Sequence, residues 1–228
     1  MKNSILLFSF IFSITLAFAQ KGCPHKVKDS EGNSYKTVRI GQQCWMAENL
    51  RFVRLPDGTP IVCGSFEESD EPRGYFPNND LNNVETYGYL LNWPAAMRAC
   101  PKGWHLPSDA EWTQLTDYVS SQPQYGCDDT GGSNAKALSA TTKWAECADK
   151  CTVGNDLSAN NATGFGALPA GGFYGNSYGY FGKGTFFWSS TESGDGKAYK
   201  RYIDYNKTSM VRDEYYKYGG GAVRCVKD

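Results

Sequence analysis

Eight cysteines constrain the fold of this 228-residue chain more than any other feature of its sequence. They occur at positions 23, 44, 63, 100, 127, 147, 151 and 225. An even number of cysteines is typical of a disulfide framework when a protein folds in an oxidising compartment. Disulfide pairing is therefore the expected state if the N-terminus directs the chain out of the cytoplasm.

The N-terminus has the pattern of a removable export signal. Lys2 supplies a short basic start, residues 5–18 are almost entirely apolar, and Ala17-Phe18-Ala19 matches the small-x-small pattern that signal peptidase reads. The apolar run is too short to span a bilayer. We therefore predict that residues 1–19 are a signal peptide, that Gln20 becomes the N-terminus, and that the protein is secreted, periplasmic or associated with the outer surface.

The rest of the chain carries no further membrane signal. A lipid anchor on Cys23 is not expected, because Lys21 stands where a lipoprotein signal has small residues. No second apolar run of spanning length follows. We expect a soluble mature protein without a transmembrane segment.

Charge and composition argue against two kinds of ligand. The 23 basic and 24 acidic residues nearly balance, so no electrostatic argument favours nucleic acid. Zinc is the alternative use of the cysteines, but Cys147-x3-Cys151 has no second close pair and the chain has only two histidines. The 25 glycines and 15 tyrosines instead favour a loop-rich fold with aromatic side chains on its surface.

The hydrophobic pattern predicts helices in the first half of the chain and strands in the second. Ser108 and Glu111 form a capping box, and apolar residues then recur at helical spacing until Pro123. The other predicted elements are short helices over 92–99 and 135–139, strands over 35–40, 44–46, 185–190, 198–205 and 222–226, and a long surface loop over 54–86 that Cys63 attaches to the rest. This order is an α+β arrangement. Since no repeat or linker divides the chain, we predict an N-terminal segment over 20–28 and a single domain over 29–228.

Seven short motifs identify a family. They are YKTVRIG (35–41), WMAENL (45–50), YGYLLNW (87–93), CPKGWHLPS (100–108), GFGALPAG (164–171), FWSSTE (187–192) and VRCV (223–226). In this order they resemble the Fibrobacter succinogenes major paralogous domain family, which is common in exported proteins of Bacteroidetes, and the resemblance covers residues 29–228. The family is in turn distantly similar to the C-type lectin-like fold and to the formylglycine-generating enzymes. The resemblance implies a small twisted antiparallel sheet, two flanking helices and long glycine-rich loops.

The resemblance also implies one disulfide. In lectin-like domains a cysteine at the end of a helix pairs with one in the last strand, and the matching residues here are Cys100 and Cys225. Position along the chain suggests a second pair, because Cys127 and Cys151 flank one insertion. Three pairings remain open for the other four cysteines, 23, 44, 63 and 147, and Cys23–Cys44 across the first hairpin is geometrically the simplest.

No residue pattern favours catalysis or a cofactor. The formylglycine-generating enzymes bind copper through two cysteines shortly before the last motif, and residues 209–216 contain none here. His105 is expected to be packed or hydrogen-bonded, because Ser108-Asp109 is merely adjacent in sequence. Calcium is not expected either, since the carbohydrate signatures of lectins are absent and the acidic run 67–71 has the character of a solvated loop.

Aromatic residues among glycines are the strongest functional feature. Tyrosines on adaptable loops supply contact area at low entropic cost, so we expect ligands to meet the segments 173–181 and 193–218 and not the helix at 108–123. The predicted ligand-binding residues are Tyr178, Tyr180, Tyr215, Tyr216 and Asp213, with Asp195, Lys200 and Glu214 as further orienting groups. The competing interpretation is that these rings pack internally.

These features favour a non-catalytic binding or adhesion module. Its partner would be a glycan or a protein ligand at the cell surface, with no cofactor, no metal and no catalytic residue. Two alternatives remain open: a structural accessory subunit of a surface assembly, and a protein similar to the formylglycine-generating enzymes that has lost its redox cysteines.

Overall fold

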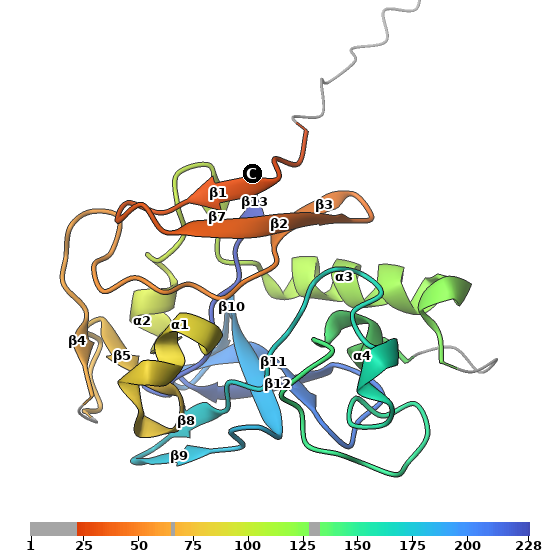
Figure 1. The fold of residues 1–228 in the computed structure, drawn as a ribbon. Coiled ribbons are helices and arrows are strands. Elements are labelled where there is room, and N and C mark those ends of the chain that lie inside the picture. Colours follow the sequence, from red (N-terminus) through yellow and green to blue (C-terminus); the bar gives the residue numbers. More distant parts are fainter. Residues whose placement is uncertain (1–21, 65–66, 128–132) are drawn as a thin grey trace, which may run out of the picture.

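The computed structural model describes residues 22–64, 67–127 and 133–228. The predicted signal peptide and Gln20 lie outside these residues. The described chain is mostly β-structure with few helices, and its strands form four sheets (Figure 1). The strands are β1 (Lys26–Lys28), β2 (Ser34–Ile40), β3 (Gln43–Met46), β4 (Val62–Cys63), β5 (Arg73–Tyr75), β6 (Leu90–Leu91), β7 (Trp104–His105), β8 (Gly172–Tyr174), β9 (Ser177–Gly179), β10 (Gly184–Gly194), β11 (Lys197–Asp204), β12 (Val211–Tyr216) and β13 (Val226–Lys227). The α-helices are α1 (Val84–Tyr87), α2 (Trp93–Ala96), α3 (Asp109–Ser121) and α4 (Ala135–Leu138), and 3₁₀ turns lie at Pro77–Asn79, Leu81–Asn83, Pro123–Tyr125 and Leu157–Ala159.

The first sheet joins the two ends of the described chain. Its strand order is β1-β2-β3-β13-β7, and every pair in it is antiparallel. Gly41, in the turn between β2 and β3, has a φ of 58°, and a Cβ there would lie 3.0 Å from the Tyr118 ring. Glycine reaches such a backbone without steric cost, which is why the hairpin turns at this position. The strands predicted over 35–40 and 44–46 are confirmed.

The closing strand is shorter than predicted. Only Val226–Lys227 pairs as β13, whereas 222–226 was expected. The carbonyl of Val223 accepts from the backbone N–H of Leu50, a residue outside any strand, while the carbonyl of Cys225 accepts from the N–H of Met46 at the start of the β13–β3 pairing. Residues 222–225 have the composition of a strand, but in the structure they pack between the sheets.

Helix α3 packs on the second sheet, whose order is β10-β11-β12 (Figure 1). The capping box is present: the Glu111 amide donates to Ser108 Oγ, and the Ser108 amide donates to Glu111 Oε2. Trp112 is fully buried, and its ring centroid lies 5.5 Å from that of Phe187 in β10 and 4.6 Å from that of Trp45 in β3. The apolar stripe predicted from the sequence therefore joins the two sheets through one helix.

The other predicted helices exist but are shorter. Asn92 caps α2, since its side-chain oxygen accepts from the Ala95 amide, and Pro94 lies in the first turn as predicted. The helix ends at Ala96, although 92–99 was expected, and α4 covers Ala135–Leu138 of the predicted 135–139.

The segment 54–86 is not the surface loop that its composition predicts. It contains β4, β5 and most of α1, and Tyr75 within it is fully buried against the ring of Phe173 at a centroid distance of 3.9 Å. Cys63 does not attach it by a disulfide, because this cysteine is free. Its elements are two to four residues long, too short for a periodic pattern to reveal.

Three disulfides cross-link the described residues. Cys100–Cys225 and Cys127–Cys151 are confirmed, with Cα separations of 5.8 and 5.4 Å, and the third pair is Cys23–Cys44. The general expectation that all eight cysteines pair is wrong, because Cys63 and Cys147 remain free. Burial raises the pKa of the Cys63 thiol.

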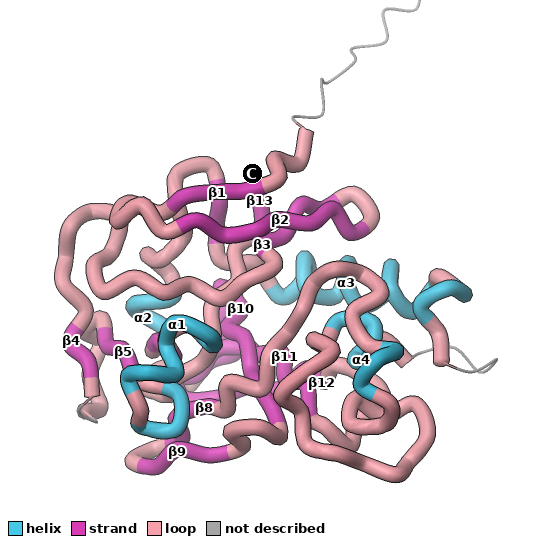
Figure 2. Tube along the Cα trace, in the orientation of Figure 1, coloured by secondary structure: helices cyan, strands magenta, loops and turns pink. Residues whose placement is uncertain are grey.

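A long loop over residues 139–171 runs from α4 to β8 (Figure 2). The ammonium group of Lys136, a residue that is only 6% exposed, fixes this loop by donating to Asp156 O at 2.8 Å, to Asn160 Oδ1 at 3.0 Å and to Asn155 O. This loop and the three disulfides give the described chain the loop-rich, disulfide-stapled α+β character that the sequence predicts. No helix in the described part of the chain is long and apolar enough to cross a membrane.

Candidate ligand-binding cleft

The second sheet has one face that α3 covers and one that it does not. Arg201 of β11 and Arg212 of β12 are register partners, and both bond the Asp109 side chain at the start of α3. Side chains alternate along a strand, so the neighbouring register partners Lys200 and Asp213 project from the other face. The same alternation places Tyr202 and Asp204 beside Lys200.

That other face is hollowed into a cleft of about 370 Å³. The cleft is lined by Tyr174, Tyr180, Gly184, Thr185, Lys200, Tyr202, Ile203, Asp204, Asp213 and Tyr215. A volume of this size is typical of sites for small ligands, which combine apolar walls with a few polar groups. Four of the lining residues are tyrosines, and they come from three different strands and the turn after β9.

Tyr180 lies at the rim of the cleft in a strained backbone conformation. Its φ is 62°, and the turn fixes it there because its carbonyl accepts from the amides of Lys183 and Gly184 at 2.8 and 2.7 Å. A bulky residue in this region costs roughly 1–2 kcal/mol. The ring is 57% exposed and meets the ring of Tyr174 edge-on. The fold thus tolerates strain to present an exposed aromatic face at the cleft.

Lys200 lies in the wall of the cleft within a cage of aromatic rings. Its ammonium nitrogen lies 5.1–5.6 Å from the ring centroids of Tyr174, Phe186, Tyr202 and Tyr215. Asp213 Oδ2 is 3.4 Å away, and the Lys200 side chain is only 8% exposed. Burial lowers the pKa of Lys200, while Asp213 acts in the opposite direction.

Two polar atoms of the lining are buried without a partner. Asp204 Oδ1 and Thr185 Oγ1 make no hydrogen bond within the described chain. Burial raises the pKa of Asp204, and backbone hydrogen bonds and nearby lysines oppose this effect only in part. Buried polar atoms are normally hydrogen-bonded, so an orphaned carboxylate oxygen beside an open cleft is a place where a ligand donor would be stabilised.

Three of the cleft tyrosines, Tyr174, Tyr202 and Tyr215, remain neutral at physiological pH. Burial raises the pKa of Tyr174, Tyr202 and Tyr215, and neighbouring carboxylates or phenols raise it further. A neutral phenol both donates and accepts hydrogen bonds. The cleft therefore combines ring faces, hydroxyls, one ammonium group and two carboxylates, which suits reversible binding of a polar ring.

The structure brings three of the five predicted ligand-binding residues together. Tyr180, Asp213 and Tyr215 line the cleft. Tyr178 is half-buried against Phe173, with ring centroids 4.9 Å apart. Tyr216 follows Tyr215 on the strand and projects from the opposite face, where it stacks on Tyr218 beside a second hollow.

Much of the two segments expected to be loops is strand. Residues 173–181 include most of the β8–β9 hairpin, and 193–218 contain β11 and β12. The sequence also missed Tyr202 and Asp204 as candidates for the site. Alternation along the predicted strand 198–205 was the signal that could have found them, since it places both on the face of Lys200.

His105 is hydrogen-bonded, as expected, and makes no contact that would activate a nucleophile. Its Nδ1 lies 2.7 Å from Asp228 Oδ1, and its Nε2 lies 2.8 Å from Glu111 Oε1. Burial alone would lower the pKa of His105, but the hydrogen bonds to the two carboxylates outweigh it and raise the pKa. Ser108 Oγ donates to Glu111 Oε2, so it belongs to the helix cap.

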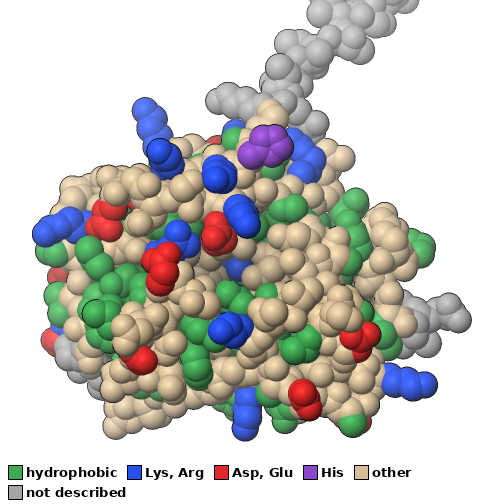
Figure 3. All heavy atoms as spheres, in the orientation of Figure 1, with side chains coloured by type: hydrophobic (Ala, Val, Ile, Leu, Met, Phe, Trp, Pro, Cys, Tyr) green, Lys and Arg blue, Asp and Glu red, His purple; other side chains and the backbone are tan. Residues whose placement is uncertain are grey.

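The other residues that could take part in chemistry have structural roles or lie away from one another. Glu67, in the acidic run, forms an ion pair with Arg73. Within residues 22–64, 67–127 and 133–228, no group of three or more His, Cys, Asp or Glu side chains is placed to hold a metal ion. On the face shown in Figure 3, positive and negative side chains are interspersed.

These observations define a mostly β domain, stapled by disulfides, with an aromatic cleft on one sheet. The chain belongs to the Fibrobacter succinogenes major domain family, whose model matches residues 38–227. The match confirms the family that the seven ordered motifs indicate. No curated protein and no solved structure is significantly similar to the chain.

Proposed function

We propose that this protein is an exported, non-catalytic binding module that holds a saccharide unit in the cleft of the second sheet. The observation that carries the proposal is the composition of the cleft: four tyrosines line it together with Asp204, whose buried Oδ1 has no hydrogen-bond partner among the described residues. A sugar ring presents C–H faces that pack on aromatic rings, and its hydroxyls donate to carboxylates.

The different groups that line the cleft support the proposal, because each suits a different part of a sugar ring. The exposed ring of Tyr180 offers a stacking face at the rim, and Asp204 Oδ1 offers a buried acceptor in the lining. Tyr174 and Tyr202 add two neutral hydroxyls to the lining. These groups bind and orient, which is why the proposed module has no catalytic step.

The proposal includes a C-type lectin-like fold and a location outside the cytoplasm. Two features support the fold: the ends of the described chain meet in one sheet, and Cys100 pairs with Cys225 as the resemblance implies. The three disulfides support the location, because such bonds persist in oxidising compartments. Glycan recognition by an exported protein would act on polysaccharides of the cell surface or its surroundings.

A glycan array with residues 20–228 tests the function, and two variants make the test specific to the cleft. Tyr180→Ala removes the exposed ring at the rim, whereas Tyr216→Ala removes a ring of similar exposure, 43%, on the opposite face of the sheet. We expect Tyr180→Ala to weaken binding of an array hit by about 1–3 kcal/mol and Tyr216→Ala to leave it unchanged. The proposal fails if no saccharide binds, or if both variants weaken binding equally.

A further inference from the structure

The charge of Lys200 is only partly compensated by the protein. Its one ion-pair partner among the described residues is Asp213, whose Oδ2 lies at 3.4 Å and whose own side chain is 48% exposed. A charge-assisted hydrogen bond is normally about 2.7–2.9 Å long, so this pair is loose. The aromatic cage attracts the ammonium group through its ring faces, and Lys200 makes no hydrogen bond to a hydroxyl of the cage within the described chain. The ammonium group therefore retains donors for an anion in the cleft.

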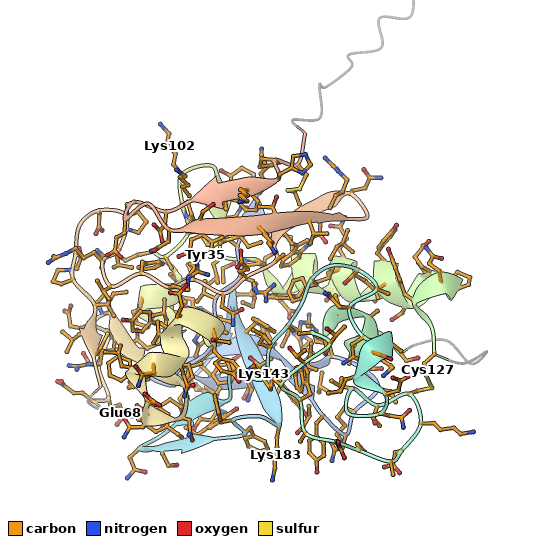
Figure 4. The ribbon with its side chains drawn as sticks, viewed as in Figure 1. Tyr35, Glu68, Lys102, Cys127, Lys143 and Lys183 are labelled. Carbon is orange, nitrogen blue, oxygen red and sulfur yellow. A yellow bond between two sulfur atoms is a disulfide. The ribbon has the colours of Figure 1, made fainter. Side chains whose placement is uncertain are left out.

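The surroundings of the cleft also favour one negative charge on the ligand. Lys183 and Lys207 lie close enough to Asp204 to lower its pKa, and Lys183 projects outwards just before β10 (Figure 4). Lys200 is the lysine that lines the cleft, together with the carboxylates of Asp204 and Asp213. Lys183 and Lys207 add positive charge from outside the lining, which favours a carboxylate on the ligand.

Asp204 adds a second requirement, because it needs a hydrogen-bond donor on the ligand. Its buried Oδ1 lacks a donor among the described residues, and a ligand that was only an anion would leave it unsatisfied or repel it. The ligand must therefore present an acidic group and hydroxyl donors on one small frame. Within the roughly 370 Å³ of the cleft, a single acidic sugar ring meets both requirements.

Building on the proposed function, we infer that the saccharide unit held in the cleft is a hexuronate. Its carboxylate accepts hydrogen bonds from Lys200 Nζ, its hydroxyls donate to Asp204 Oδ1, and a face of its ring packs on Tyr180. Asp213 then has an unexpected effect: as a carboxylate beside the Lys200 ammonium, it competes with the ligand for the same donors. Removal of the Asp213 charge should strengthen binding.

The test measures binding of trigalacturonate and of its methyl ester by isothermal titration calorimetry. The methyl ester keeps the ring and the hydroxyls but removes the negative charges. We expect the acid to bind at least tenfold more tightly than the ester, and Asp213→Asn to tighten binding of the acid by about fivefold. Lys200→Met, which retains a long apolar stem within the aromatic cage, should abolish the preference for the acid.

Glu214→Gln is the matched control for Asp213→Asn. Glu214 is the next residue on β12, pairs with Lys197 at 2.8 Å, and projects from the opposite face of the sheet. This variant changes the net charge by the same amount outside the cleft, so it should leave the affinity for the acid unchanged. Equal effects of the two variants would show a general charge effect and would overturn the inference.

The outcomes also separate the inference from the proposed function. If neutral saccharides bind through Tyr180 while trigalacturonate binds no better than its ester, the hexuronate inference is wrong and the proposed function stands. If Asp213→Asn weakens binding of the acid, Asp213 is an acceptor for ligand hydroxyls and the inference is likewise wrong. If no saccharide of either kind binds, both fail.

Discussion

The guanidinium Nε of Arg224 lies 2.6 Å from Oδ1 of Asn49, although 175 residues separate the two in sequence. Arg224 is 1% exposed, and its other nitrogens donate to the backbone carbonyls of Met46, Phe165 and Gly166. Burial lowers its pKa to about 9, with Glu48 acting in the opposite direction. One side chain thus joins three of the motifs by which the family is recognised.

Replacement of Arg224 should therefore destabilise the whole domain. Arg224→Lys keeps the charge but leaves several of these acceptors without donors, so we expect a loss of about 3–5 kcal/mol in the free energy of unfolding. Urea denaturation provides the measurement. Arg212→Lys, at a half-exposed arginine that pairs with Asp109, is the control and should cost less than about 1 kcal/mol. Equal losses in the two variants would contradict the role assigned to Arg224.

The bridge from His105 to Asp228 and Glu111 should make stability depend on pH. The pKa of His105 in the folded protein is raised above its ordinary value of 6.5. The stabilisation is therefore complete below pH 6.5 and is lost as the pH rises through the folded-state pKa. The difference in melting temperature between the wild type and His105→Gln should be largest near pH 5.5–6 and vanish at alkaline pH. Asp228→Asn should reduce the same difference, and a difference that grows with pH would disprove the bridge.

Tyr180→Gly should separate stability from binding. Glycine adopts the φ of 62° without strain, which should raise the free energy of unfolding by up to about 1 kcal/mol. The lost ring contact with Tyr174 offsets part of this gain, so the variant should be at least as stable as the wild type. The same change removes the stacking face and should abolish saccharide binding. Thermal unfolding and calorimetric titration measure the two effects. A variant that unfolds readily would show that the ring is needed for packing.

Each disulfide should stabilise the fold more, the longer the loop that it closes. Cys100–Cys225 has a sequence separation of 125 and Cys23–Cys44 one of 21. In the chain-entropy account, replacing the first pair by alanines costs about 4–5 kcal/mol and replacing the second about 3 kcal/mol. Urea denaturation of the two double variants measures both. The account is wrong for this protein if the shorter link proves the more stabilising of the two.

The elements predicted most accurately from the sequence are those with a local signal. The capping box at Ser108 and the following apolar stripe define α3 without reference to the rest of the fold. The hairpin around Gly41 has an equally local cause. By contrast, β5 depends on a distant contact, since its Tyr75 packs on Phe173 almost 100 residues later, and no short pattern encodes such a contact.

The candidate site likewise has a part that the sequence predicts and a part that depends on distant contacts. Tyrosines among glycines pointed to Tyr180 and Tyr215, but composition alone could not separate them from Tyr178 and Tyr216. That distinction depends on the face of a strand from which each ring projects and on the register that pairs Lys200 with Asp213. Register follows from the pairing of whole strands, which the sequence of one strand does not specify.

The position of β13 has a consequence for biosynthesis. Strand β3 reaches β7 only through β13, so the sheet that begins at Lys26 stays open until residues 226 and 227 have been made. Before residues 225–227 have been made, a nascent chain has two unpaired strand edges and no Cys225 to pair with Cys100. Until β13 is available, the incomplete chain would depend on holding factors that keep those edges apart from other unpaired strands.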